Sequence, residues 1–113
     1  MVNYQPKQGD IIMINLNPTK GHEQSGVRPA LIISNDQYFK LTKLLIICPI
    51  SNNNKKFPLH LDLKQLDKSI KTTGAIFIEH VRTIDPNVRT IGFKESVSSE
   101  VMEEIKNIIN LLW

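Results

Sequence analysis

The 113-residue chain has a net charge of +3, with 41% hydrophobic and 22% charged residues. These values are typical of one globular domain over residues 1–113, and no apolar stretch approaches the roughly 20 residues that span a bilayer. One cysteine excludes an internal disulfide, and the polar N-terminus lacks a secretory signal core, so we expect a cytoplasmic protein without a membrane segment.

The positive charge is concentrated in the body of the chain. Up to residue 94 there are 13 Lys/Arg against 7 Asp/Glu, whereas the remaining residues have 1 against 4. A basic body attracts nucleic acid or acidic protein segments. Ordinary solvated lysines explain the same charge equally well, so charge alone does not decide between these alternatives.

The apolar pattern predicts five or six strands followed by a helix. The first two strands are expected at 9–16 and 29–34, and they can pair as an antiparallel hairpin. The run at 43–50 is almost unbroken, which is typical of a central strand buried on both faces. Between the second and third strands, residues 35–41 fit a short helical turn capped by Asn35 or Asp36.

The next strands are expected at 57–63 and 75–84, separated by a loose polar turn at 63–71. Alternation at 57–63 places three leucines on one face and His60 on the other, exposed face. In the last strand, strict alternation places Glu79 and Val81 on one face and His80 and Arg82 on the other, unless a bulge intervenes.

The chain ends in an amphipathic helix that Ser98 or Ser99 can cap. Its apolar residues recur at 3.6-residue spacing: Val101, Ile105, Ile108, Ile109 and Leu112. Strands followed by one packing helix predict a mainly β fold, a small curled antiparallel sheet or partly open barrel with a C-terminal helix.

A polar loop at 17–28 separates the first two strands and ends on Arg28. A loop of this length is uncommon in a compact domain and more often serves function. Pro29 fixes the extended backbone after Arg28, so a guanidinium fork suited to phosphate is held at the root of the loop. The alternative is that Arg28 pairs with Glu23 and braces the loop, and both contacts can exist together.

The segment "GDIIMINLNPTKGHEQSGVRPALIIS" (9–34) resembles the opening of the MazF/PemK family of toxin–antitoxin endoribonucleases. The similarity continues, in the same order, through "CPIS" (48–51), "KKFPLH" (55–60) and "GAIFIEHVRTID" (74–85). It therefore covers most of the chain, and the first segment is far longer than a short motif.

The resemblance implies a CcdB/PemK-type, SH3-like barrel that forms a homodimer and cuts single-stranded RNA, often mRNA, at short sequences without a metal. Its products would carry a 2′,3′-cyclic phosphate and a 5′-hydroxyl. A cognate antitoxin with an acidic tail would block the RNA groove. No metal-ligand spacing, phosphate-binding glycine loop or GxSxG elbow occurs, so no cofactor is indicated.

Cleavage of this kind requires a base, an acid and fixed positive charge around the phosphate. Arg28 is the main candidate for the phosphate, and its family position is regarded as catalytic. Ser51 stands where the family usually has threonine, which keeps the hydroxyl but loses the methyl group that restricts its rotamer. Glu23 can orient Arg28 or accept a proton, and orientation is favoured because an exposed carboxylate is a weak base near neutral pH.

A second group of residues is predicted to bind RNA. Amides and lysines after the third strand suit base edges and phosphates, although a solvated polar turn is the alternative. Histidines titrate near neutral pH, although inert surface histidines are the alternative. The predicted RNA-binding residues are His22, Gln24, Asn52, Asn53, Lys55, Lys56, His60, Glu79 and Arg82. Glu79 is also a possible partner of Arg82.

Two other functions remain open at this point. A CcdB-like poison of DNA gyrase would use this fold without RNA chemistry, but the loop that carries Arg28 speaks against it. A catalytically silent module that binds RNA or antitoxin is made slightly more plausible by the serine at position 51.

Overall fold

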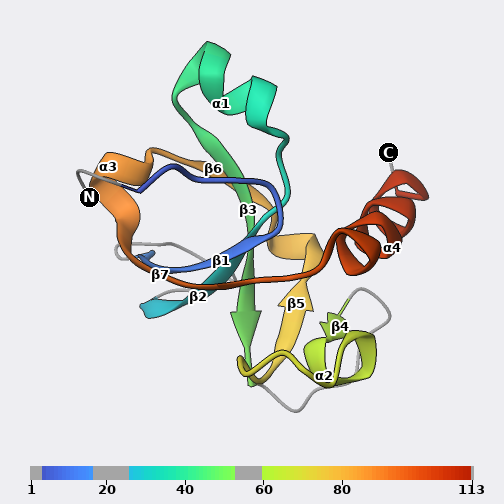
Figure 1. The fold of residues 1–113 in the computed structure, drawn as a ribbon. Coiled ribbons are helices and arrows are strands. Elements are labelled where there is room, and N and C mark those ends of the chain that lie inside the picture. The colour runs from blue at the N-terminus through green and yellow to red at the C-terminus, as the bar shows by residue number, and fades with distance from the viewer. Residues whose placement is uncertain (1–3, 17–25, 53–59, 113) are drawn as a thin grey trace.

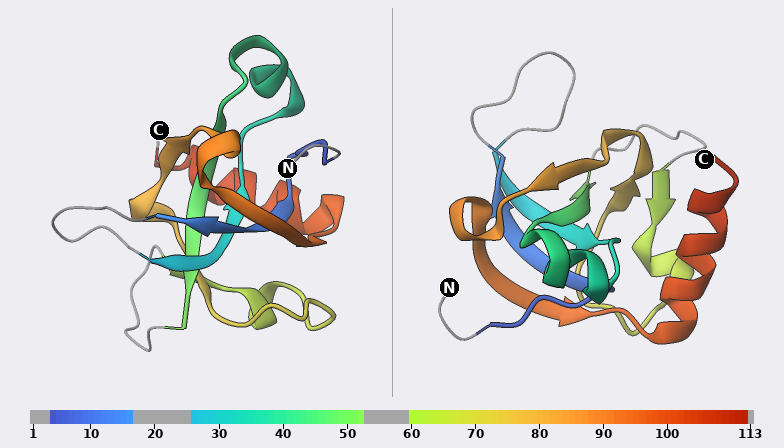
Figure 2. Two further views of the ribbon diagram at one scale, coloured as in Figure 1. Left: turned by 90° about the vertical axis from the view of Figure 1, so that its left-hand side faces the viewer. Right: turned by 90° about the horizontal axis from the view of Figure 1, so that it is seen from above.

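The computed structural model describes residues 4–16, 26–52 and 60–112. Across these ranges an antiparallel sheet curls on itself, and α4 lies along one side of it (Figures 1 and 2). The strands are β1 (Asp10–Asn15), β2 (Val27–Ile32), β3 (Leu45–Ser51), β4 (His60–Asp62), β5 (Ala75–Phe77), β6 (Arg82–Ile84) and β7 (Thr90–Ser96). The helices are α1 (Asp36–Thr42), α2 (Leu63–Leu66), the 3-10 turn η1 (Ile78–His80), α3 (Pro86–Arg89) and α4 (Ser99–Asn110).

The strands follow the order β4-β5-β3-β2-β1-β7, and β6 pairs with β3 beside this path. β1 and β2 form the predicted antiparallel hairpin, in which Ile14 pairs with Arg28. β3 is central, as predicted, because it pairs with β2, β5 and β6. Within the described ranges the end strands β4 and β7 do not pair with each other, so the sheet is a partly open barrel and the predicted fold class is confirmed.

Alternate residues of the central strands face two separate cores. In β3, Leu45 and Ile47 belong to one buried cluster, whereas Cys48 and Ile50 belong to the other. β1 and β2 divide their side chains in the same way. The unbroken apolar run of β3 follows from this arrangement, since burying each such side chain stabilises the fold by about 1.5–3 kcal/mol.

The C-terminal helix α4 covers one of these cores (Figure 1). Ser98 caps it by accepting a hydrogen bond from the backbone N–H of Val101 at 3.1 Å, as predicted. Its buried face consists of Val101, Met102, Ile105 and Ile109. Leu112 was predicted on the same face, but α4 ends at Asn110 and Leu112 is 43% exposed. The helical turn predicted at 35–41 is also present as α1, which Asn35 caps.

The strand predicted at 57–63 is shorter where the structure describes it. β4 spans only His60–Asp62, and residues 57–59 lie outside the described ranges. Asp62 ends the strand because its carboxylate accepts a hydrogen bond from the backbone N–H of Gln65 at 3.1 Å and so caps α2. The predicted loose turn at 63–71 therefore begins with a short helix.

The single strand predicted at 75–84 is wrong. The 3-10 turn η1 separates β5 from β6, and the backbone N–H of Val81 donates to the carbonyl of Ile78 at 3.2 Å. A turn advances about three residues per revolution, so the side chains from Glu79 onward no longer alternate as in a strand. The proposed face assignment of Glu79, His80 and Arg82 fails for this reason.

Two elements between 86 and 96 were not predicted. Asp85 caps α3, and Pro86 stands in its first turn. β7 pairs antiparallel with β1, and the register of this pairing shifts twice, between Ile11 and Ile12 and between Met13 and Ile14. The sequence of β7, "TIGFKES", has no sustained alternation, so this strand is specified mainly by the partner edge that β1 offers.

Glu95 of β7 fastens the segment before β5 to the sheet. Its carboxylate accepts hydrogen bonds from the backbone N–H groups of Lys71 (3.1 Å) and Thr72 (2.7 Å) and from the Thr72 hydroxyl (2.5 Å). Burial acts to raise the pKa of Glu95, but these bonds and the charge of Lys94 outweigh it, so the pKa lies below its ordinary value.

We expect this contact to stabilise the fold near neutral pH and to be lost in acid. Because the folded-state pKa of Glu95 is lowered, its contribution is complete above the unfolded pKa and declines as the pH falls through the folded value. Glu95→Gln should lower the free energy of unfolding at pH 7 by about 1–2 kcal/mol. Urea titrations of both proteins at pH 7 and pH 3 test this, because the difference should shrink at pH 3. A difference that is equal at both pH values would contradict the assignment.

Candidate functional site

Arg28 and Ser51 lie on neighbouring strands of the sheet. The β2–β3 pairing joins Ile32 to Ile47, Leu31 to Cys48 and Ala30 to Pro49. This pairing ends at Ala30 and Pro49, so Arg28 and Ser51 each stand two residues beyond its last pair, and Ser51 pairs with β5 instead. Both residues are half-buried, so neither is sealed inside a core.

Ser51 is the last residue of β3 and is held in place by β5. It pairs with Ala75, and Ala75 pairs in turn with Asp62 of β4. His60 lies two residues from Asp62 and pairs with Phe77 of β5. β5 thus brings the end of β3 and the histidine of β4 onto one short piece of sheet.

The His60 ring is fixed by two contacts. It stacks on Phe77 with ring centroids 3.7 Å apart and planes at 13°. Its Nε2 atom lies 2.5 Å from the Oε2 atom of Glu79. Only 10% of the His60 side chain is exposed, so the predicted exposed position is wrong, because a strand's polar face can still be covered by neighbouring strands and turns.

Glu79 contacts His60 and not Arg82, which the sequence offered as its possible partner. Strict alternation places Glu79 and Arg82 on opposite faces, and η1 turns the carboxylate of Glu79 toward His60. The Nε2 atom of His80 lies 4.0 Å from the same carboxylate oxygen, and the His80 ring meets Phe77 edge-on at 5.7 Å. Arg82 is half-buried on β6, where it pairs with Ile47.

The sequence did not single out Phe77 as a site residue. It is 3% exposed and belongs to an apolar run, so its composition indicated only a core residue. Its position opposite His60 in the β4–β5 register was the missing information. The buried thiol of Cys48 is chemically inert by comparison, because burial and then the negative charge of Glu79 raise its pKa to about 12.

The remaining predicted site residues are placed less completely. Asn52 is exposed immediately after β3. The other positions lie outside the described residues: His22, Glu23, Gln24, Asn53, Lys55 and Lys56. In residues 4–16, 26–52 and 60–112 no group of three His, Cys, Asp or Glu side chains is arranged to hold a metal ion, and metal-free cleavage stays a prediction.

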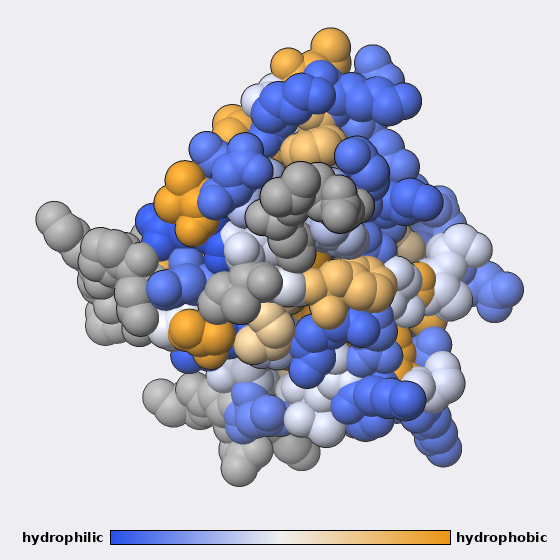
Figure 3. Space-filling view, turned by 60° about the vertical axis from the view of Figure 1, so that its left-hand side comes forward, coloured by the Kyte–Doolittle hydropathy of each residue, from blue (hydrophilic) through white to orange (hydrophobic). Residues whose placement is uncertain are grey.

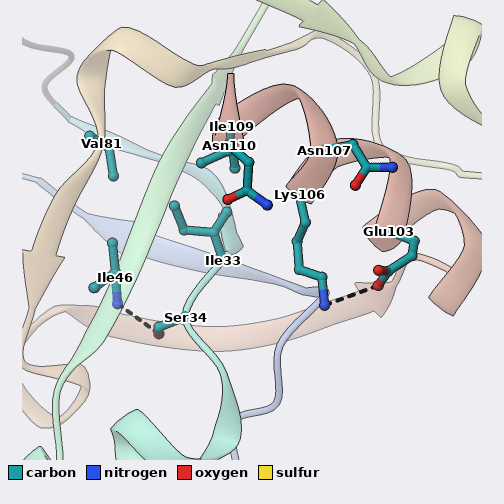
Figure 4. A pocket seen from close by; sticks show the side chains of 9 residues that line it. All are labelled: Ile33, Ser34, Ile46, Val81, Glu103, Lys106, Asn107, Ile109 and Asn110. Atoms are coloured by element: carbon teal, nitrogen blue, oxygen red, sulfur yellow. Dashed lines mark hydrogen bonds and ion pairs between the residues drawn. The ribbon is translucent and has the colours of Figure 1, made fainter. Parts of the chain in front are cut away.

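A separate hollow of about 610 Å³ lies between α4 and the sheet (Figure 4). Ile33, Ile46 and Val81 face Ile109 of α4 across it. Its rim includes Lys106, whose ammonium forms an ion pair with Glu103 at 3.0 Å. None of the predicted site residues that the structure describes lines this hollow.

Apolar side chains also occur on the surface. Figure 3 shows them on one face as separate patches among hydrophilic side chains. The large exposed apolar residues in the described ranges are Val27, Leu41, Val88, Phe93, Leu111 and Leu112. Scattered exposure of this kind is normal for a globular protein.

No helix among the described residues is long and apolar enough to cross a membrane.

Comparison with known proteins decides the family. The family described as "PemK-like, MazF-like toxin of type II toxin-antitoxin system" matches residues 7–113. The chain belongs to this family. The resemblance seen in the sequence is therefore confirmed, and it extends well beyond the quoted segments.

Relatives of the family agree in sequence and in fold. An endoribonuclease MazF from Staphylococcus saprophyticus is 31% identical over 110 residues, which cover 93% of this chain and 88% of the relative. The crystal structure of MazF from Deinococcus radiodurans superposes with a TM-score of 0.80 at 29% identity, covering 97% of both chains. A MazE–MazF structure from the same organism gives a TM-score of 0.76 at 29% identity, covering 97% of this chain and 96% of that one.

Proposed function

We propose that this protein is the endoribonuclease toxin of a type II toxin–antitoxin system and cleaves single-stranded RNA, such as mRNA, at specific sequences without a metal. Membership of the MazF-like family supports the toxin and nuclease assignments. The observation that supports the assignment to particular residues is the β2–β3 pairing, whose last pair, Ala30 with Pro49, lies two residues from both Arg28 and Ser51. The products would carry a 2′,3′-cyclic phosphate and a 5′-hydroxyl.

In this proposal Arg28 donates two hydrogen bonds to the non-bridging oxygens of the phosphate and neutralises the charge that develops there. The Ser51 hydroxyl donates a further bond to the same group. Glu23 orients Arg28. Asn52 and the lysines after it hold the strand, while His60, fixed by Phe77 and Glu79, offers the exposed part of its side chain as a polar contact for RNA.

The partners follow from the family and from charge. A homodimer and a cognate antitoxin with an acidic tail are part of the proposal, and solved MazE–MazF complexes of the Deinococcus relative support the second. The basic body of the chain suits an acidic partner as well as RNA. We place the protein in the cytoplasm as a single toxin domain, where a buried free thiol such as Cys48 remains reduced.

A cleavage assay in EDTA tests the function. The purified protein is incubated with a long single-stranded RNA and, as a matched control, with the same RNA annealed to its complement. We expect discrete fragments with cyclic-phosphate ends from the single strand only. RNA binding without cleavage would point to the silent module, whereas inhibition of gyrase without cleavage would point to CcdB-like action.

His60→Ala should weaken RNA binding more than it affects the chemical step. Losing one hydrogen bond costs about 0.5–1.5 kcal/mol, so KM should rise several-fold. His80→Ala is the matched control, because His80 lies near the same carboxylate, at 4.0 Å, but meets Phe77 only edge-on. Steady-state kinetics on a fluorogenic RNA measure both variants. Equal KM values for His60→Ala and the unsubstituted protein would remove His60 from the RNA-binding surface.

A further inference from the structure

Gly74 lies directly against the peptide unit that follows Ser51. Its φ of +115° is a conformation that favours glycine. A Cβ atom built on Gly74 would lie 2.7 Å from the carbonyl oxygen of Ser51, 2.9 Å from its carbonyl carbon and 3.3 Å from the nitrogen of Asn52. These atoms belong to the backbone, so no side-chain rotation can relieve the collision.

The opposite side of Gly74 is also fixed. Its carbonyl accepts a hydrogen bond at 3.0 Å from the backbone N–H of Leu63, the first residue of α2. Asp62, which caps α2, pairs with Ala75, the residue after Gly74. Gly74 is therefore held between the start of α2 and the end of β3, and it sets the distance between them.

We propose that Gly74 is a positioning residue for Ser51, which it places against the RNA phosphate by allowing β3 and the start of β5 to meet without a side chain between them. This inference rests on the proposed function. A side chain at position 74 would push the end of β3 outward and move the Ser51 hydroxyl. Displacement of a reacting group by about 1 Å can cost on the order of 10²-fold in rate.

Another glycine of this chain separates this effect from backbone strain. Gly9 has a similar φ of +92°, but the nearest atoms to a Cβ atom on it would lie no closer than ordinary contact: Val97 Cγ2 at 3.4 Å, the Val97 carbonyl oxygen at 3.7 Å and Met102 Cγ at 3.8 Å. Gly9 is the residue just before β1. Its backbone forms hydrogen bonds with Ile32 and Val97, which lie outside the proposed site. Gly9→Ala therefore introduces the same kind of strain without moving Ser51.

The test compares the kcat and KM of Gly74→Ala and Gly9→Ala on one RNA, with backbone amide NMR shifts of the free proteins. We expect Gly74→Ala to lower kcat about tenfold or more while KM stays within about threefold, because the displacement acts mainly on the Ser51 hydroxyl at the reacting phosphate, and Asn52 is one of nine residues predicted to bind RNA. The amide signals of Ser51 and Asn52 should shift strongly in this variant. Gly9→Ala should lose stability but keep both kinetic constants.

A second variant keeps the inference testable if Gly74→Ala does not fold. Asp62→Ala removes the cap of α2 without adding a side chain against β3, and it loosens the hydrogen bond between Leu63 and Gly74. We expect smaller shifts at Ser51 and Asn52 and a several-fold lower kcat. Unchanged Ser51 and Asn52 signals in whichever variant folds, or equal loss of kcat in Gly9→Ala, would overturn the positioning role. Absence of cleavage by the unsubstituted protein would instead refute the proposed function, since the NMR readout needs no RNA.

Discussion

Arg28→Ala is expected to lower kcat for RNA cleavage by about 10³-fold, equivalent to about 4 kcal/mol of transition-state stabilisation. The loss is large because the guanidinium contributes both a fixed charge and two aligned donors. The fold should persist, since Arg28 is only half-buried on β2 and the hairpin is held by backbone pairing with β1. The measurement is single-turnover cleavage at one ionic strength, with circular dichroism to verify folding.

Two variants control for charge and for geometry. Arg28→Lys keeps the charge but loses the planar fork, so its activity should lie between those of alanine and arginine. Arg89→Ala removes one positive charge from α3, where Arg89 donates to the carbonyl of Asn15 at 3.2 Å, and it should keep activity within about threefold. Near-normal cleavage by Arg28→Ala would exclude the proposed role of this residue.

Local patterns were sufficient to predict the elements whose burial is regular. The β1–β2 hairpin, the central β3 and the amphipathic α4 were all predicted, because the buried side chains of each element recur at a regular spacing in its own sequence. The capping residues Asn35 and Ser98 could also be predicted, because each accepts a hydrogen bond from a backbone N–H only three residues later. These features depend on contacts between residues that are near in sequence or paired by a hairpin.

The elements that were missed depend on distant partners. β7 acquires its pairing from β1, about 80 positions earlier, and its own composition is ambiguous. η1 interrupts an apolar run whose letters fit a strand equally well. An apolar sequence reports that side chains are buried, but it does not report whether the backbone remains extended between them.

The candidate site also combines features that local sequence predicts with features that depend on distant partners. Arg28 and Ser51 were found through their sequence context, and the β2–β3 register is consistent with the assignment without testing it. The burial of His60 and its stacking on Phe77 could not be predicted, because both depend on the pairing of β4 with β5. In the sequence Gly74 is only the residue before the strand predicted at 75–84, whereas its importance comes from a collision visible only in three dimensions.

Ser51→Ala is expected to lower kcat about 10²-fold, because one preorganised donor at the phosphate is removed. KM should change little, since alanine leaves the neighbouring RNA-binding residues in place. Ser51→Thr restores the usual family residue and should keep or modestly raise kcat, because its methyl group restricts the hydroxyl rotamer.

The outcome for threonine separates chemistry from packing. Position 51 pairs with the small Ala75 on β5, so the additional methyl group should be accommodated without displacing the strand. A fully active alanine variant would show that the hydroxyl takes no part in catalysis. A loss of more than about tenfold in the threonine variant would show that this site is built for serine, and that its departure from the family pattern has been compensated elsewhere in the groove.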